Sequence, residues 1–300
     1  MTPRRIVLGL LLVVIAVWAL APAVRGALLV RRTSSGPSAI EAVAGLPAES
    51  VRFTASDGVP LAGSYVAVPG PTGIFVLVHG FKTDRREMTD LAAMVLREGF
   101  SVLLYDSRGT GESGGVFGVG ATEDRDIIGA VDFLRSPAKP GAPHIFVLGI
   151  SLGAGDALLA AAEDDRIQGV LADSPWADEH VQLERMGSVP LGAVTIPVLP
   201  YEPALVDWLI AGRLEDARPI AAIGRIAPRS VQLIHSTDDG NATTTLADAQ
   251  ALLAAGGSRT GLWIAASGGH AGAYRANPED YRLQFRAFIR AALDCCAMRR

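Results

Sequence analysis

The sequence predicts an α/β protein with a doubly wound, mostly parallel sheet, and three features of the chain lead to this class. Short, almost wholly apolar runs of strand length alternate with longer stretches of helical character, the pattern of repeated β-α units. Several of these runs lack polar alternation, so their strands are expected to be buried on both faces. The chain has 300 residues, 49% of them hydrophobic and 19% charged, which is enough for a large core.

The predicted elements follow one another in a regular order. The expected strands are residues 51–55, 61–68, 73–78, 101–105, 145–150, 167–172, 230–235 and 261–265. Helices are expected over residues 84–97, from 122–124 onwards, and over 157–162, 245–255 and 278–293. The turn at Asp57-Gly58 joins the first two strands as an antiparallel hairpin. The first helix is predicted to begin with Asp84 as N-cap and Glu87 as its capping-box partner.

The N-terminus predicts a membrane segment. Arg4 and Arg5 precede Ile6–Val24, a run of 19 residues without a charge, and a membrane-spanning helix needs about 20. A cleaved signal peptide ending at Ala21–Ala23 is the alternative interpretation. The length of the run favours an uncleaved anchor. Arginines on both sides of the run give little charge bias for its orientation, and an exported domain is the expected arrangement.

The domain organisation follows from composition. Residues 1–25 are predicted to form the membrane anchor or signal segment, 26–48 a linker that includes the polar stretch Thr33–Ser38, and 49–300 the globular domain. Between about residues 176 and 219 the β-α alternation breaks, with prolines at 190, 197, 200 and 203, and this region is predicted to be a lid.

Composition excludes several classes of protein. The formal net charge of −4 and the scattered arginines argue against a nucleic-acid partner. The two cysteines, Cys295 and Cys296, are adjacent, where a disulfide would be strained, and they fit no zinc pattern. No metal or organic cofactor is expected.

One motif stands at the end of the strand predicted over residues 145–150. There Gly149–Gly153 reads Gly-x-Ser-x-Gly and leads into helix-forming alanines. A serine at the apex of a strand-turn-helix projects its hydroxyl above the sheet, and small flanking residues relieve the crowding. Ser151 is therefore a candidate nucleophile. The motif alone is also compatible with a merely structural turn serine.

The order of the other motifs resembles that of the α/β-hydrolase family. Ser151 is followed by an acid within residues 234–241 and then by His270, which is the family's nucleophile, acid, histidine order. His79–Phe81 is similar to its oxyanion-hole loop, and Asp106–Ser113 is similar to its Asp-x-Arg-Gly-x-Gly-x-Ser turn. The resemblance runs from about Val51 to the C-terminus.

The resemblance implies a role for each of these residues. Ser151 is implied as nucleophile and His270 as general base, with the backbone amides of Phe81 and Leu152 as oxyanion donors. His79 is expected to support the oxyanion loop. Asp106, Arg108, Asp173 and His235 are expected to be structural.

The acid is chosen between two neighbours by spacing. The family pattern His-Gly-x-x-Asp-x-x-Val-Pro, placed on His235, puts the acid at Asp239 and leaves Asp238 at an unconstrained position. This sequence departs from the pattern at Ser236, Ala242 and Thr243, which replace the glycine, valine and proline.

The sequence thus predicts a serine hydrolase that cleaves a carboxylic ester, thioester or amide through an acyl-enzyme. Its expected partners are a small-molecule or lipid-like acyl substrate and a membrane. A catalytically silent ligand-binding protein of the same fold and a membrane-tethered scaffold are the alternatives, and secretion after signal cleavage is the alternative location.

Overall fold

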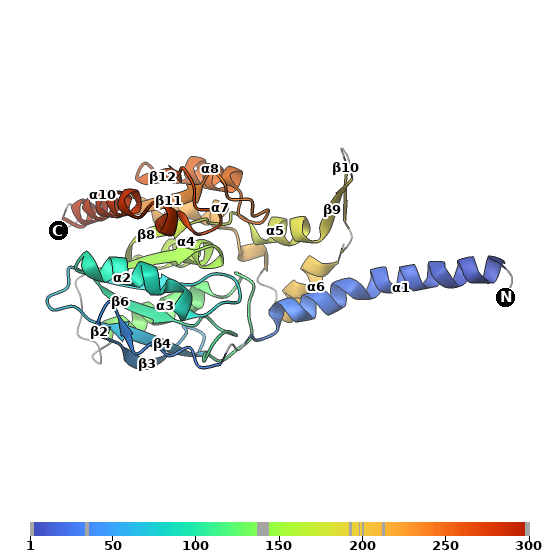
Figure 1. The fold of residues 1–300 in the computed structure, drawn as a ribbon, viewed down its shortest axis with the longest axis horizontal. Helices are drawn as coiled ribbons and strands as arrows, with labels where there is room; N and C mark the ends of the chain where they lie inside the picture. The colour runs from blue at the N-terminus through green and yellow to red at the C-terminus, as the bar shows by residue number, and fades with distance from the viewer. Residues whose placement is uncertain are drawn as a thin grey trace.

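This computed structural model describes residues 3–33, 36–136, 144–191, 194–197, 199, 201–211 and 214–297, and its centre is an eight-stranded sheet (Figure 1). The strands from edge to edge are β12 (Thr260–Ala265), β11 (Ser230–Ser236), β8 (Ile167–Asp173), β7 (Ile145–Ile150), β5 (Ile74–Val78), β6 (Ser101–Tyr105), β4 (Pro60–Val66) and β3 (Glu49–Thr54). The six strands from β12 to β6 are parallel, and β4 is antiparallel to both of its neighbours. The predicted fold class is confirmed.

Helices cover both faces of the sheet. They are α2 (Thr89–Arg97), α3 (Asp124–Arg135), α4 (Leu152–Glu163), α8 (Leu246–Ala255) and α10 (Pro278–Ala297). In β5, Val76 and Val78 share a core with α3, α4 and α8. Phe75 and Leu77 share the opposite core with α2 and α10. Burial on both sides explains why this strand is a continuous apolar run in the sequence.

The start of the predicted helix over residues 84–97 differs from the expectation. Its first turn is a 3-10 helix, η1 (Arg85–Met88), and the α-helix begins only at Thr89. Asp84 does act as N-cap, since its side chain accepts the N–H of Arg86 at 3.0 Å. The capping-box prediction for Glu87 is wrong, because its carboxylate accepts the N–H of Gly80 instead.

Several short elements were not expected from the sequence. They are β1 (Ala42–Val43), β2 (Leu46–Pro47), α7 (Pro219–Ala222), η3 (Ile223–Ile226) and α9 (Ala273–Ala276). Each is too short to carry a periodic apolar pattern of its own. Their positions are set by packing against neighbouring elements.

Residues 176–219, which we call the lid, form a cluster of short elements between β8 and β11. They are α5 (Glu179–Met186), β9 (Ser188–Leu191), β10 (Val194–Pro197), α6 (Glu202–Leu209) and η2 (Leu214–Asp216), with β9 and β10 paired as an antiparallel hairpin. Trp176, Leu183, Val206 and Leu214 are buried in one cluster, together with Leu29 from the N-terminal helix. The lid therefore has an apolar core that is shared with the N-terminal helix.

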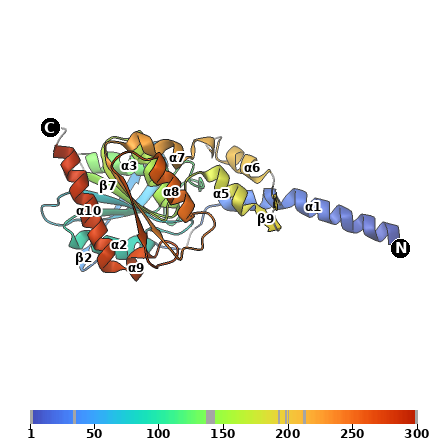
Figure 2. The same cartoon turned by 90° about the horizontal axis from the view of Figure 1, so that it is seen from above.

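The N-terminal helix α1 (Pro3–Val30) extends away from the domain in both views (Figures 1 and 2). Every residue from Pro3 to Leu20 is exposed. In the described part of the chain, this is the one helix long and apolar enough to cross a membrane. It continues past residue 25, where the predicted membrane segment ends. Ser34 and Ser35 of the predicted linker lie outside the described residues.

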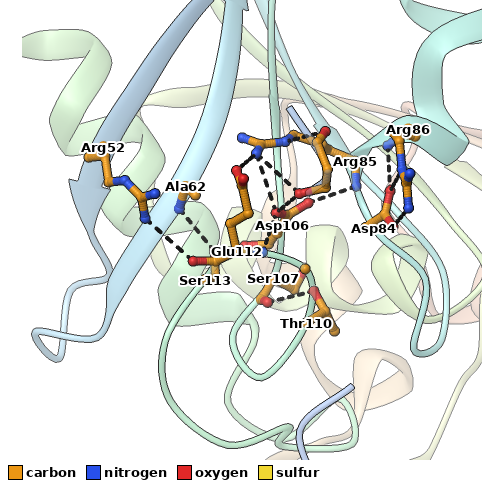
Figure 3. A network of polar contacts seen from close by, with 12 residues as sticks. Arg52, Ala62, Asp84, Arg85, Arg86, Asp106, Ser107, Thr110, Glu112 and Ser113 are labelled. Atoms are coloured by element: carbon orange, nitrogen blue, oxygen red, sulfur yellow. Dashed lines mark hydrogen bonds and ion pairs between the residues drawn. The ribbon is translucent and has the colours of Figure 1, made fainter. Parts of the chain in front are cut away.

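The Gly-rich turn after β6 is held by the carboxylate of Asp106, which Figure 3 shows at the centre of a polar network. This carboxylate accepts the N–H groups of Arg85 at 2.9 Å and Glu112 at 2.8 Å, and the hydroxyl of Ser38 at 2.5 Å. Gly111 has a φ of +44°, and a Cβ there would lie 2.3 Å from Asp106 Oδ2. The motif therefore fastens the turn to η1 and to the segment that leads in from α1.

Replacing Asp106 should destabilise the whole domain. Asp106→Ala leaves two buried donors and one partly buried donor without their acceptor, so we expect the free energy of unfolding to fall by about 3 kcal/mol. Urea unfolding of the detergent-solubilised full-length protein measures this. Asp90→Ala is the control, because Asp90 is exposed and its pair with Arg275 is open to solvent. Equal stability of the two variants would contradict the bracing role.

Candidate active site

Ser151 lies at the sharp turn between β7 and α4. Its backbone has a φ of +52° and a ψ of −118°, a strained conformation for a non-glycine residue that costs about 1–3 kcal/mol. A Cβ on Gly149 would lie 2.1 Å from the carbonyl oxygen of Gly153, and one on Gly153 would lie 2.6 Å from that of His79. Both glycines are therefore required by close backbone contacts.

His270 lies in the loop between β12 and α9, above the turn that carries Ser151. Its Nε2 is 2.8 Å from the hydroxyl oxygen of Ser151, although the two residues are 119 positions apart in the chain. The His270 side chain is 30% exposed. The imidazole can therefore reach both the serine and a molecule from solvent.

Asp239 and its neighbour Asp238 point in different directions. Asp239 is buried, with Oδ2 at 3.0 Å from Nδ1 of His270 and Oδ1 accepting the N–H of Asn241 at 2.9 Å. Asp238 is exposed and accepts the N–H of Gly269 at 2.8 Å. Backbone hydrogen bonds from Gly269 and Gly268 lower the pKa of Asp238. The structure thus brings Asp239, rather than Asp238, to the histidine.

Two buried hydroxyls that the sequence analysis missed also hold the histidine loop. Thr244 Oγ1 lies 3.1 Å from Nδ1 of His270, and Ser174 Oγ accepts the N–H of Ala271 at 3.1 Å. Neither belongs to a motif with a fixed spacing. Ser174 has a φ of +54° directly after β8, a conformation that the sequence does not signal.

His235 is wholly buried beneath this loop. Its Nε2 is 2.9 Å from the carbonyl oxygen of Thr244 and 3.6 Å from Oδ2 of Asp239, while Nδ1 is 2.9 Å from the carbonyl oxygen of Ser236. The ring thus links the start of the 236–244 loop to its end. Such a contact fits the structural role expected for it.

Asp173, at the end of β8, also has a structural role. Its backbone carbonyl accepts the N–H of Ser151 at 2.8 Å, so the nucleophile turn is fastened to the neighbouring strand. The carboxyl group is buried, which raises its pKa to about 7 despite the hydrogen bond from Ser174. It makes no contact with His270 in the described hydrogen bonds.

The loop with His79, Gly80 and Phe81 lies directly beside the serine. A Cβ on Gly80 would be 3.5 Å from Cβ of Ser151. His79 Nε2 accepts the N–H of Ser107 at 3.0 Å, so Nδ1 carries the proton and donates to the carbonyl of Gly80 at 2.8 Å. His79 is therefore a loop support. Hydrogen bonds in the described part of the chain leave the N–H groups of Phe81 and Leu152 unengaged.

Glu87 fixes the same loop from the other side. Its Oε2 accepts the N–H of Gly80 at 2.9 Å and the hydroxyl of Thr83 at 2.5 Å. The sequence predicts a capping-box role for Glu87 because it lies three positions after Asp84. The carboxylate instead holds Gly80 and Thr83, on either side of Phe81 and Lys82.

A pocket of about 410 Å³ opens over Ser151 and His270. It is lined by side chains from both the sheet edge and the lid, among them Phe81, Leu91, Val119, Gln182, Met186 and Tyr274. Glu179 of α5 also lines it, and burial raises the pKa of this carboxyl well above its usual range. Among the described residues, no three His, Cys, Asp or Glu side chains are grouped to hold a metal ion.

Comparisons with known proteins agree with the fold and with a hydrolase family. The family model described as serine aminopeptidase, S33, matches residues 69–210. The uncharacterized protein YqkD of Bacillus subtilis is 26% identical over 86% of this chain and 85% of its own length. The thiohydrolase aneE of Aspergillus aculeatus is 30% identical, over 46% of this chain and 45% of its own length. A solved esterase of Pyrococcus furiosus has a TM-score of 0.70 at 21% identity, covering 87% of this chain and 97% of that one.

Removing the Glu87 carboxylate should loosen the loop beside Ser151. A single charged hydrogen bond contributes about 1.5 kcal/mol, so we expect amide hydrogen exchange in residues 79–84 to accelerate about tenfold in Glu87→Ala. Mass spectrometry of peptides from this loop measures the rate. Glu87→Gln keeps an acceptor oxygen and should exchange close to the wild-type rate. Unchanged exchange in the alanine variant would exclude the bracing role.

Proposed function

Because this chain is a hydrolase of the α/β-hydrolase fold family, we propose that it is a serine hydrolase that cleaves a carboxylic ester, thioester or amide through an acyl-enzyme. The observation that carries the proposal is the continuous chain of hydrogen bonds from Asp239 through His270 to Ser151, at 3.0 and 2.8 Å, at the floor of a pocket. A ligand-binding protein or a scaffold has no need for this arrangement. The catalytically silent alternatives are therefore disfavoured.

In the first half of the reaction, Ser151 Oγ attacks the substrate carbonyl while His270 Nε2 takes its proton. A serine hydroxyl is a weak nucleophile at neutral pH and needs this base. Asp239 accepts the hydrogen bond from Nδ1, which keeps Nε2 unprotonated and stabilises the imidazolium as it forms. The imidazolium then gives its proton to the leaving oxygen, sulfur or nitrogen as the acyl-enzyme forms.

The negative charge that develops on the carbonyl oxygen needs donors already in position. We assign this role to the backbone N–H groups of Phe81 and Leu152, and one such donor contributes about 3–4 kcal/mol to transition-state stabilisation. Leu152 is the first residue of α4, so the positive end of the helix dipole adds to the field there. In the second half, His270 activates a water molecule that releases the acid and restores Ser151.

An ester is the substrate class that we favour. The support is the fold shared with the Pyrococcus furiosus esterase, while the name of the Aspergillus aculeatus relative points towards a thioester and the description of the matched family model towards an amide. All three reactions use the same acyl-enzyme. They differ only in the leaving group that His270 protonates.

We further propose that α1 anchors the enzyme in a membrane with the hydrolase domain outside the cytoplasm. The support is a helix of 28 residues that is apolar over a membrane-spanning length, and the folded domain covers only 6% of that length. Cleavage after Ala23 and secretion is the alternative.

Ser151→Ala should abolish turnover and leave the fold intact. The change removes the nucleophile and a small hydroxyl from a strained turn, so residual hydrolysis of p-nitrophenyl acetate should be below about a hundredth of wild type. Labelling by a fluorophosphonate should be lost in parallel. Ser136→Ala, at the C-terminal end of α3, is the matched control. Labelling that persists in the Ser151 variant would exclude this serine.

The two neighbouring aspartates provide a second test. Asp239→Asn removes the negative charge beside Nδ1 of His270 and introduces an amide N–H that favours the wrong tautomer, so we expect kcat to fall by up to about 10⁴ with KM nearly unchanged. Asp238→Asn keeps an acceptor for Gly269 and should change kcat less than about tenfold. Steady-state kinetics of both variants on one ester give the ranking. A larger loss in the Asp238 variant would transfer the role to that residue.

A further inference from the structure

The lid lies against the base of the N-terminal helix. Figures 1 and 2 both show α6 beside the domain end of α1. A Cβ on Gly26 would be 3.2 Å from Cδ2 of Leu205, and Leu29 is buried together with Val206 and Ile210. The glycine thus permits α1 and α6 to pack in close contact.

An ion pair fixes the same junction. Arg25 Nη1 lies 2.8 Å from Oε2 of Glu202, whose side chain is fully buried, and it also donates to the carbonyl of Met186 at 3.2 Å. Burial raises the pKa of Glu202, and the charge of Arg25 opposes that shift. Removing the arginine would leave a buried carboxylate without its partner, which is costly. The lid and the base of α1 therefore behave as one unit.

The helix end is also fixed to the loop that carries Phe81. Lys82 Nζ donates to the carbonyl oxygen of Leu28 at 2.5 Å, which satisfies a free carbonyl in the last turn of α1. The same ammonium lies 5.8 Å from the ring centroid of Phe81 and 5.6 Å from that of Phe117. The site, the lid and the base of α1 are thus joined.

This junction lies at the edge of the uncharged run. The run ends at Val24, but Pro22 within it is already buried, as are Gly26 and Leu29 further along, so the packed base of α1 overlaps the last turn of the run. A bilayer that covers the fully exposed part, Ile6–Leu20, ends close to the lid. The lid therefore lies close to the lipid headgroups.

Large apolar side chains are exposed on and next to α6 and at the base of α1. Trp208 on α6 is 76% exposed, the largest fraction among the exposed large hydrophobic residues of the described chain. Tyr201 is 37% exposed, Leu28 52% and Val24 59%. Tryptophan and tyrosine are the residues that favour the membrane-water interface. Arg31, exposed directly after α1, is suited to anionic headgroups.

We propose that these residues, Val24, Leu28, Tyr201 and Trp208, form a lid-anchor face that docks on the bilayer in which α1 is inserted, and that the substrate enters the pocket from that bilayer. The inference rests on the proposed function and names its substrate class, a membrane-resident amphiphile with an acyl bond. Docking buries the exposed rings and leaves the catalytic residues on the domain side of the interface.

Met186 connects the face to the pocket. Its backbone carbonyl accepts a hydrogen bond from Arg25, and its side chain both lines the pocket and is 38% exposed. Gln182, one helical turn earlier in α5, lines the same pocket. A chain that leaves the bilayer beside α1 therefore meets the pocket wall at α5.

The position of Trp208 can be measured without catalysis. Full-length protein is reconstituted in vesicles of phosphatidylcholine and phosphatidylglycerol that contain brominated phosphatidylcholine, which quenches tryptophan at the interface. In a Trp18→Phe background, which removes the tryptophan of the apolar run, we expect clear quenching. The additional change Trp208→Phe should remove most of it. Equal quenching in the two proteins would overturn the docking surface.

Substrate entry is tested with two esters. Trp208→Glu should lower hydrolysis of p-nitrophenyl palmitate in the vesicles by about tenfold, because a charge opposes docking, and should leave p-nitrophenyl acetate in solution within about twofold. Leu283→Glu is the control, since Leu283 is 59% exposed on α10, away from α1. Equal losses in both variants would overturn the inference. If neither ester is hydrolysed and Ser151 is not labelled, the proposed function fails, while the quenching result still decides the docking.

Discussion

The backbone of Ser151 is the constraint on which the site depends. A positive φ at a non-glycine residue persists only where the surroundings determine it. Here the Ser151 N–H is bound to the carbonyl of Asp173, and the turn is closed by contacts that only Gly149 and Gly153 allow. The central strands, buried on both faces, supply the rigid support. The strain is thus sustained by the most stable part of the molecule.

The other site residues occupy loops, so each requires its own bracing. Glu87 and His79 hold the loop of Phe81, whereas Thr244, Ser174 and His235 hold the loops of His270 and Asp239. All of these braces except Glu87 are buried, and all except the Thr244 hydroxyl, which contacts the His270 ring, make the cited hydrogen bonds with backbone groups. For the proposed reaction they hold the hydroxyl, the imidazole and the two N–H groups in place before any substrate arrives, which is the condition for electrostatic catalysis.

The sequence reveals the parts of this arrangement that depend on local pattern. Strands such as Ile145–Ile150 are recognisable because burial on both faces demands an unbroken apolar run. The spacing of the family pattern from His235 distinguished Asp239 from Asp238, and of the two only Asp239 contacts His270 in the structure. The role of Thr244 was missed because its partner, His270, is distant in the chain. The role of Glu87 was missed because its spacing from Asp84 imitates a helix cap. Contacts of that kind are decided by packing, which a local pattern does not encode.

The junction of α1 with the lid constrains how the pocket opens. Glu202 is buried with one oxygen, Oε1, left without a hydrogen bond in the described chain, so it depends on Arg25 for compensation. Moving α6 away from α1 separates this ion pair and exposes Leu29 and Val206 to water. Both changes cost free energy, so the two helices are expected to stay together. Rearrangement of the Met186 and Gln182 side chains at the pocket wall leaves the pair of Arg25 and Glu202 in place. In this arrangement the part of the lid that we propose to face the membrane stays fixed, and the wall of the pocket is the part free to adjust to the proposed acyl substrate.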